Sequence, residues 1–399
     1  MSRSRVIFFL VSAVLVFPIL AGTLLLAADR QEPQEDSLYK YLAIFSEVLG
    51  MIRQAHVDEP DMNALMAGAL DGTTDALDPF SLYIPAGQVE GYLDARAVGR
   101  RHTGMTLLKE SGIAYVVTVE KGSPAGLAGV QPGDLISKVD GRSTRLMPLW
   151  EIQEIMAGKP GTKVELDFLR LGETVKASFE LKEFEPPAPS LETLDRGVVM
   201  LRIPNFDGET AAQVRELLKR PEAAAGGKAA NGRLLVDLRG VSVGEASEAY
   251  ATAGLFASGD LGALMRRAQE VEAFSGQLAP SWKGKMVVLV DRGTLGPGEI
   301  FATVLRQKEI AELVGERTFG YAGRQEMAEL SSGGRLLITG AFYSGPDRKP
   351  LNESLKPDLL VNERSRTFLE REVPMTELIL RRGVSRVLGE DQETAKKAA

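Results

Sequence analysis

The chain has 399 residues, of which 44% are hydrophobic and 25% charged, and this composition is ordinary for a globular protein of two or three domains. A formal net charge of −7 and a pI near 5.3 give no support for nucleic-acid binding. The absence of cysteine excludes disulfides, thiolate metal sites and cysteine nucleophiles. The two histidines, His56 and His102, precede the predicted α/β region, which excludes a histidine-based triad or zinc site there. We predict neither a metal nor a cofactor.

The N-terminal segment 1–28 has the pattern of an export signal. Arg3 and Arg5 form a basic flank, and Val6 to Ala28 contains no charged residue. This pattern predicts either a cleaved signal peptide or a retained membrane helix. In both cases the remainder is expected on the periplasmic side of the inner membrane, anchored or secreted.

Residues 29–37 are polar and acidic and read as a short linker. An N-terminal helical segment, 38–98, follows. Apolar residues at helical spacing predict helices over Leu38–Val57 and Met62–Leu77, and Pro79 ends the second.

Short strands and turns then replace the helical pattern over 99–184. We predict strands at Ile113–Val119, Lys163–Leu169 and Thr174–Leu181, and a helix at Leu149–Ala157. The turn residues of 122–125 and 129–134 (GSPA and GVQPGD) fall in an order that resembles a bacterial, circularly permuted PDZ domain.

That resemblance implies binding of peptide or protein C-termini, which add as a strand to an exposed sheet edge while loop N–H groups hold the carboxylate. The alternative is a domain that only packs against its neighbour. The peptide-binding residues predicted in this way are Thr103, Gly104, Met105, Thr106, Leu107, Leu149 and Ile152.

A proline-rich linker, Glu185–Ser190, leads into an α/β core over 191–365. Predicted strands alternate with helices, which indicates a mostly parallel sheet, and 223–231 reads as a surface loop. The crevice of such a sheet lies beyond the carboxyl ends of its strands, where Asp237–Gly244 and Asp291–Gly298 both arrive.

The turn Asp291–Gly298 follows a buried strand, Met286–Val290, and precedes a helix. Many hydrolases present a nucleophile at such a turn. This one contains neither serine nor cysteine, and Thr294 supplies its only hydroxyl.

From Leu42 to Val361 the chain resembles the carboxy-terminal processing peptidases, also called tail-specific proteases. The shared motifs lie at Asp78–Ser81, Leu234–Arg239, Gly293–Ile300, Gly315–Gly320, Gln325 and Lys356–Asp358. The resemblance implies a ClpP/crotonase-like α/β peptidase core with an inserted PDZ domain, followed by a C-terminal helical tail, 366–399.

The same resemblance places the family's serine nucleophile at Gly296 and its lysine base at Tyr321. Only the glutamine that positions the lysine is kept, as Gln325. Glycine has no side chain to attack with, and tyrosine, with a pKa of about 10, is a poor base at neutral pH. These replacements predict a degenerate catalytic site.

Three functions stay open. The first is a non-catalytic scaffold or regulator that binds C-termini, and the second is a subunit that pairs with an active paralogous peptidase. The third is an active serine-type endopeptidase with a rearranged site. The hydroxyls that such a site could use are Thr294 and Ser242, but neither has a base in a matching motif, because Lys283, Lys285 and Lys308 lie outside one. Solvated turn hydroxyls are the simpler explanation of both residues.

Overall fold

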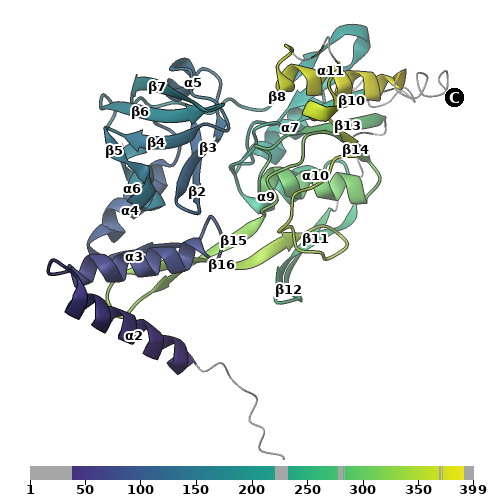
Figure 1. Cartoon of the computed structure of the whole chain (residues 1–399). Helices are drawn as coiled ribbons and strands as arrows, with labels where there is room; N and C mark the ends of the chain where they lie inside the picture. Colours follow the sequence, from purple (N-terminus) through teal and green to yellow (C-terminus); the bar gives the residue numbers. More distant parts are fainter. Residues whose placement is uncertain are drawn as a thin grey trace, which may run out of the picture. The chain divides into compact units, whose positions relative to one another are not determined.

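The computed structural model describes most of the chain (Figure 1). The described residues are 38–390 without 221–231, 277–281, 283, 368–369 and 371. The predicted export segment 1–28, the linker 29–37, the loop 223–231, Lys283 and the end of the tail lie outside them.

The chain divides into two compact units, 1–66 and 67–399. The first contains helix α2 (Leu38–Ala55), none of whose residues is buried, and the start of α3 (Met62–Asp75). Across the described parts of residues 38–390, no helix is both long and apolar enough to cross a bilayer.

The second unit contains a six-stranded sheet in the order β17-β14-β13-β10-β9-β8. All neighbouring pairs are parallel except β8 with β9. This arrangement confirms the predicted mostly parallel sheet. The strands are β8 (Ser190–Thr193), β9 (Val199–Arg202), β10 (Arg233–Asp237), β13 (Lys285–Val290), β14 (Ala311–Gly315) and β17 (Leu359–Leu360).

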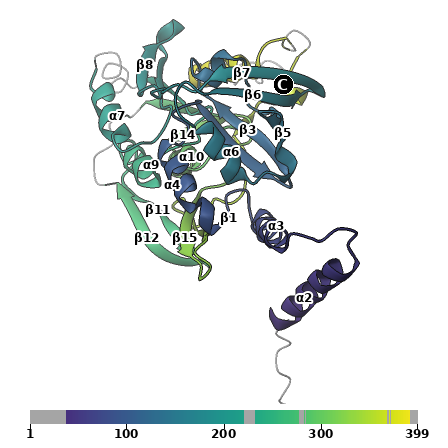
Figure 2. The ribbon, with the colours of Figure 1, turned by 90° about the vertical axis from the view of Figure 1, so that its left-hand side faces the viewer.

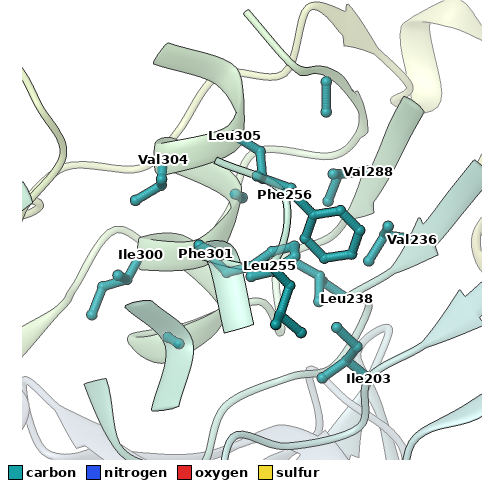
Figure 3. Packing of buried hydrophobic residues seen from close by; sticks show 14 of the residues in the cluster. Ile203, Val236, Leu238, Leu255, Phe256, Val288, Ile300, Phe301, Val304 and Leu305 are labelled. Carbon is teal, nitrogen blue, oxygen red and sulfur yellow. The ribbon is translucent and has the colours of Figure 1, made fainter. Parts of the chain in front are cut away.

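Helices cover both faces of this sheet because the middles of its central strands, Leu234–Val236 and Met286–Val290, are apolar on both sides. Val236 and Val288 point toward α9 and α10, where they join a core that includes Phe301 (Figure 3). Leu235 and Leu289 point to the other face and pack against α11. The covering helices are α7 (Thr210–Leu218), α9 (Ala246–Ala253), α10 (Pro297–Gln307) and α11 (Met375–Leu388).

A five-stranded antiparallel sheet was not predicted; Figure 2 shows several of its strands together beside α9. Its strand β1 lies inside the segment 38–98 predicted as helical, so that prediction is wrong at Leu82–Ile84. The strands are β1 (Leu82–Ile84), β11 (Gly259–Arg266), β12 (Gln269–Gly276), β15 (Gly323–Glu329) and β16 (Arg335–Ser344). Helix α4 (Val89–Val98) follows β1 and lies within the segment 38–98 predicted as helical, although no separate bounds were predicted for it.

The segment predicted as a PDZ domain forms a third sheet, in the order β2-β3-β4-β6-β7 with β5 beside β4. Strand β2 is therefore an edge strand. The strands are β2 (Met105–Glu110), β3 (Ile113–Val119), β4 (Leu135–Val139), β5 (Arg142–Ser143), β6 (Lys163–Arg170) and β7 (Glu173–Glu180), and the helices are α5 (Pro124–Leu127) and α6 (Leu149–Met156). Short 3-10 turns occupy Ala86–Gln88, Thr144–Leu146, Asp195–Gly197 and Glu363–Ser365.

Candidate functional site

The turn between β13 and α10 is held by the carboxylate of Asp291, which lies at the carboxyl end of β13. Its Oδ1 accepts hydrogen bonds from the N–H of Gly293 in the same turn, at 3.0 Å, and from the N–H of Gly240 in the facing loop, at 2.9 Å. Burial raises the pKa of Asp291, and these bonds offset part of that rise. Asp291 therefore joins the two turns that sequence analysis expected at one crevice.

Thr294 cannot serve as a nucleophile in this arrangement, because it is fully buried. Its hydroxyl donates to the carbonyl of Leu238 at 3.0 Å and accepts from the N–H of Asp291 at 3.0 Å. The sequence left this hydroxyl as a possible replacement for the serine. The structure instead makes this hydroxyl a link between the turn and Leu238, the residue that follows β10.

Gly296 immediately precedes α10 and has φ +56°, a backbone conformation that favours glycine. A Cβ added there would meet no atom closer than the carbonyl oxygen of Tyr321, at 3.8 Å. The position thus has room for a side chain and a backbone suited to having none.

Glu299, one turn into α10, ties Gly296 to the segment before β15. Its Oε2 accepts from the N–H of Gly296 at 3.1 Å and of Tyr321 at 2.9 Å. Its Oε1 accepts from the N–H of Gly320 at 2.6 Å and from the hydroxyl of Thr318. Burial raises the pKa of this carboxyl to about 7, despite the four donors. Glu299 was not among the predicted site residues, although it lies inside the Gly293–Ile300 motif that carries the resemblance.

Tyr321 lies among aromatic rings. It stacks on Phe80 with ring centroids 4.2 Å apart, and Phe342 meets it edge-on at 5.2 Å. The Tyr321 hydroxyl hydrogen-bonds to the hydroxyl of Thr339. Burial raises the pKa of Tyr321 well above the ordinary value of 10. A phenol so placed stays protonated at neutral pH and cannot act as a general base.

Gln325 lies two residues into β15 and bonds to the same threonine. Its Nε2 donates to Thr339 Oγ1 at 2.7 Å, while its buried Oε1 has no hydrogen-bond partner among the described residues. The structure therefore gathers Gly296, Tyr321 and Gln325 around one turn, linked through Glu299 and Thr339.

Ser242 is engaged by the PDZ segment. Its Oγ lies 2.9 Å from Thr106 Oγ1 on β2 and 3.0 Å from Thr118 Oγ1 on β3. Two of the lysines that lie outside a matching motif are also engaged elsewhere. Lys285 donates to the carbonyl of Arg386 at 2.7 Å and Lys308 to that of Ser258 at 3.3 Å. No rearranged hydroxyl–lysine pair forms among these described residues.

A groove of about 330 Å³ runs beside the edge strand β2 and helix α6. It is lined by all but two of the predicted peptide-binding residues, Gly104 and Ile152. Ile152 is fully buried in the PDZ core. Gly104, with φ +72°, lies where a Cβ would come within 2.1 Å of Ser123 Cβ, so its role is a close backbone approach.

The predicted carboxylate-binding loop uses several of its N–H groups internally. Those of Thr103 and Gly104 donate to the carbonyl of Arg100, at 3.1 and 2.7 Å, and that of Met105 donates to the Thr103 hydroxyl at 3.2 Å. The structure thus differs from the expectation of free donors at these three positions.

Arg100, which was not among the predicted peptide-binding residues, also lines the groove. It is 9% exposed, and its Nη1 pairs with Glu120 at 3.1 Å. Its Nε and Nη2 have no hydrogen-bond partner among the described residues. Buried guanidinium donors without partners are rare, because each one costs free energy. No sequence signal separates this arginine from its exposed neighbour Arg101.

Comparison with known families supports the two assignments made from motifs. Residues 197–361 match the model of peptidase family S41, and residues 115–170 match a PDZ domain model. The photosystem II D1 C-terminal processing protease has a similar fold, with a TM-score of 0.64 at 22% identity over 81% of this chain and 88% of that one. These findings define an α/β protein of the S41 peptidase fold that carries a PDZ domain.

Two curated bacterial proteins are similar over most of their lengths. The carboxy-terminal-processing protease of Bartonella bacilliformis is 26% identical over 364 residues, covering 90% of this chain and 83% of that protein. The carboxy-terminal processing protease CtpA of Bacillus subtilis is 27% identical over 374 residues, covering 90% and 78%. The chain belongs to the family of carboxy-terminal processing peptidases with a PDZ domain.

Proposed function

We propose that this protein is a non-catalytic member of its family, which binds the C-termini of peptides or proteins through its PDZ groove and acts as a scaffold or regulator. The observation that carries the proposed absence of catalysis is the glycine at position 296. The residue stands where the resemblance places the nucleophile, and it offers no atom that could form an acyl intermediate.

The surroundings of Gly296 support the same conclusion. Tyr321 is a protonated phenol in an aromatic stack, and the hydroxyls of Thr294 and Ser242 are both committed to hydrogen bonds. Loss of one member of a catalytic unit leaves only a residual acceleration of about 10³–10⁴-fold over water. An enzyme built on this site would lack both the nucleophile and the base.

The proposed binding of C-termini rests on the groove beside β2. An edge strand offers unpaired backbone groups for a peptide strand, and α6 supplies the opposite wall. The walls are mostly apolar, as Met105, Leu107 and Leu149 illustrate, which suits an apolar C-terminal residue. We assign the terminal carboxylate to Arg100, whose unpartnered N–H groups are the donors that the loop does not supply.

The proposal places the protein on the periplasmic side of the inner membrane, anchored or secreted through residues 1–28. Its partners there are proteins with accessible C-termini, and an active paralogous peptidase is one candidate for regulation.

Catalysis is tested with the purified chain, casein and a fluorophosphonate probe. We expect neither cleavage above a buffer control nor labelling. Cleavage that disappears in Thr294→Ala or Ser242→Ala would establish the alternative, an active serine-type endopeptidase with a rearranged site.

Peptide binding is tested with pairs of apolar-ended peptides that carry a free or an amidated C-terminus. The free form should bind clearly better, because amidation removes the charge that Arg100 faces. Arg100→Gln should erase this preference, whereas Arg101→Gln, a change at the exposed neighbour, should keep it. Equal binding of both forms by the unchanged protein, or no binding, would leave the domain as a packing element.

A further inference from the structure

The groove is a composite of two domains. The PDZ segment supplies Met105, Leu107 and Gln153, while the peptidase core supplies Val243, Leu337 and Gln325. A peptide held in the groove therefore contacts side chains of the core as well as those of the PDZ segment. Gln325 is the core residue of this lining that can make hydrogen bonds through its side chain.

Gln325 has an unmet acceptor. Its amide nitrogen donates to Thr339 Oγ1, and the Tyr321 hydroxyl bonds to the same oxygen. The lysine that the resemblance places at position 321 would supply an ammonium group as a hydrogen-bond donor near the Gln325 amide. The phenol of Tyr321 is instead bonded to Thr339. The buried Oε1 of Gln325 is left without a donor among the described residues, which costs free energy until a donor satisfies it.

We propose that Gln325 determines ligand specificity by accepting a hydrogen bond from the bound peptide. The preferred ligand has an apolar C-terminal residue and, a few positions upstream, a side chain that donates from a hydroxyl or an amide. This inference rests on the proposed peptide-binding function. It gives a residue that the resemblance assigns to lysine positioning a second use in recognition.

The test uses the full chain and free-carboxylate peptides that end in leucine. Members of a pair differ only by threonine or valine, which are similar in shape, at the second, third or fourth position from the end. At one of these positions the threonine peptide should bind roughly three- to tenfold more tightly, as expected for one hydrogen bond.

Gln325→Leu should bind both members of that pair equally. Gln269→Leu makes the same chemical change at an exposed position of β12 that does not line the groove, and it should keep the preference for threonine. Matching thermal unfolding of both variants would show that each remains folded.

The possible failures are distinguishable. If the unchanged protein prefers free over amidated peptides but never threonine over valine, this inference is wrong and the proposed function stands. Persistence of the preference in Gln325→Leu, or its loss in Gln269→Leu, also overturns the assignment to Gln325. Absence of any peptide binding removes the proposed function itself.

Discussion

Glu299 is a residue on which the geometry of the turn around Gly296 depends. It accepts four hydrogen bonds from Gly296, Thr318, Gly320 and Tyr321, and no cation is among these partners. The oxygens of such a buried carboxylate stabilise the turn by accepting hydrogen bonds. The charged form is nevertheless disfavoured, because burial removes its hydration. Its protonation should therefore be visible in the stability of the whole core.

The free energy of unfolding should fall as pH rises from about 4.5 to about 7. Over this range the folded chain keeps the Glu299 proton, whose pKa burial raises from 4.5 to about 7, and the unfolded chain has released it. At about 1.4 kcal/mol per pKa unit, the loss due to this residue is about 3 kcal/mol. Urea unfolding at several pH values measures it.

The comparison needs two variants. Glu299→Gln should lack this part of the decline, because the amide does not titrate. Glu329→Gln, at a side chain that is 71% exposed, should follow the unchanged protein. If the free energy of unfolding of Glu299→Gln falls with pH as steeply as that of the unchanged protein, the raised pKa has been assigned to the wrong group.

Restoring the two missing side chains should not restore a working enzyme. A serine at Gly296 has room, but at φ +56° it adopts a conformation that costs roughly 1–3 kcal/mol in a residue other than glycine. A lysine at Tyr321 loses the stack on Phe80, and Pro297, directly after the new serine, has no N–H to offer an oxyanion. Gly296→Ser with Tyr321→Lys should therefore cleave casein weakly or not at all. Robust cleavage would show that the scaffold had lost only two side chains.

At the scale of elements, the sequence predicts what local patterns determine. The apolar runs of β10 and β13, the helix α6 and the turns of the PDZ segment follow from periodicity and turn residues. The antiparallel sheet does not follow from local patterns. Its strand β1 pairs with β16, which lies far along the chain, and β15 is half-buried with no clear alternation of buried and exposed residues. Arg100 was missed for a related reason, since its burial arises only from packing.

The loop before β2 makes a prediction at the same scale. Gly104→Ala places a Cβ 2.1 Å from Ser123 Cβ, whereas Gly122→Ala, with a similarly positive φ of +82°, enters open space. Both changes strain the backbone, but only the first also causes a clash. Gly104→Ala should therefore lower the free energy of unfolding by about 1–3 kcal/mol more than Gly122→Ala. Chemical denaturation measures both, and equal losses would show that the contact with Ser123 relaxes freely.

At the scale of the whole molecule, strand β1 explains how the PDZ segment and the core meet. The chain enters the antiparallel sheet at β1, builds the PDZ sheet, and then returns to form the core. The Asp78–Ser81 motif before β1 places Phe80 on Tyr321, and Ser242 of the core bonds to β2 and β3. The groove is therefore bounded by both domains, which makes recognition by a core residue such as Gln325 feasible.

The attachment of the chain to the membrane is the remaining prediction at this scale. Val6 to Ala28 is an uncharged run long enough to span a bilayer, and Arg3 and Arg5 favour a cytoplasmic N-terminus. If the run is retained, the protein should sediment with membranes and resist carbonate extraction, whereas a variant that starts at Asp29 should stay soluble. N-terminal sequencing of the native protein shows whether the segment is retained or cleaved. A soluble form that begins near Asp29 would mean that the segment is a cleaved signal peptide and that the PDZ groove acts on partners away from the membrane.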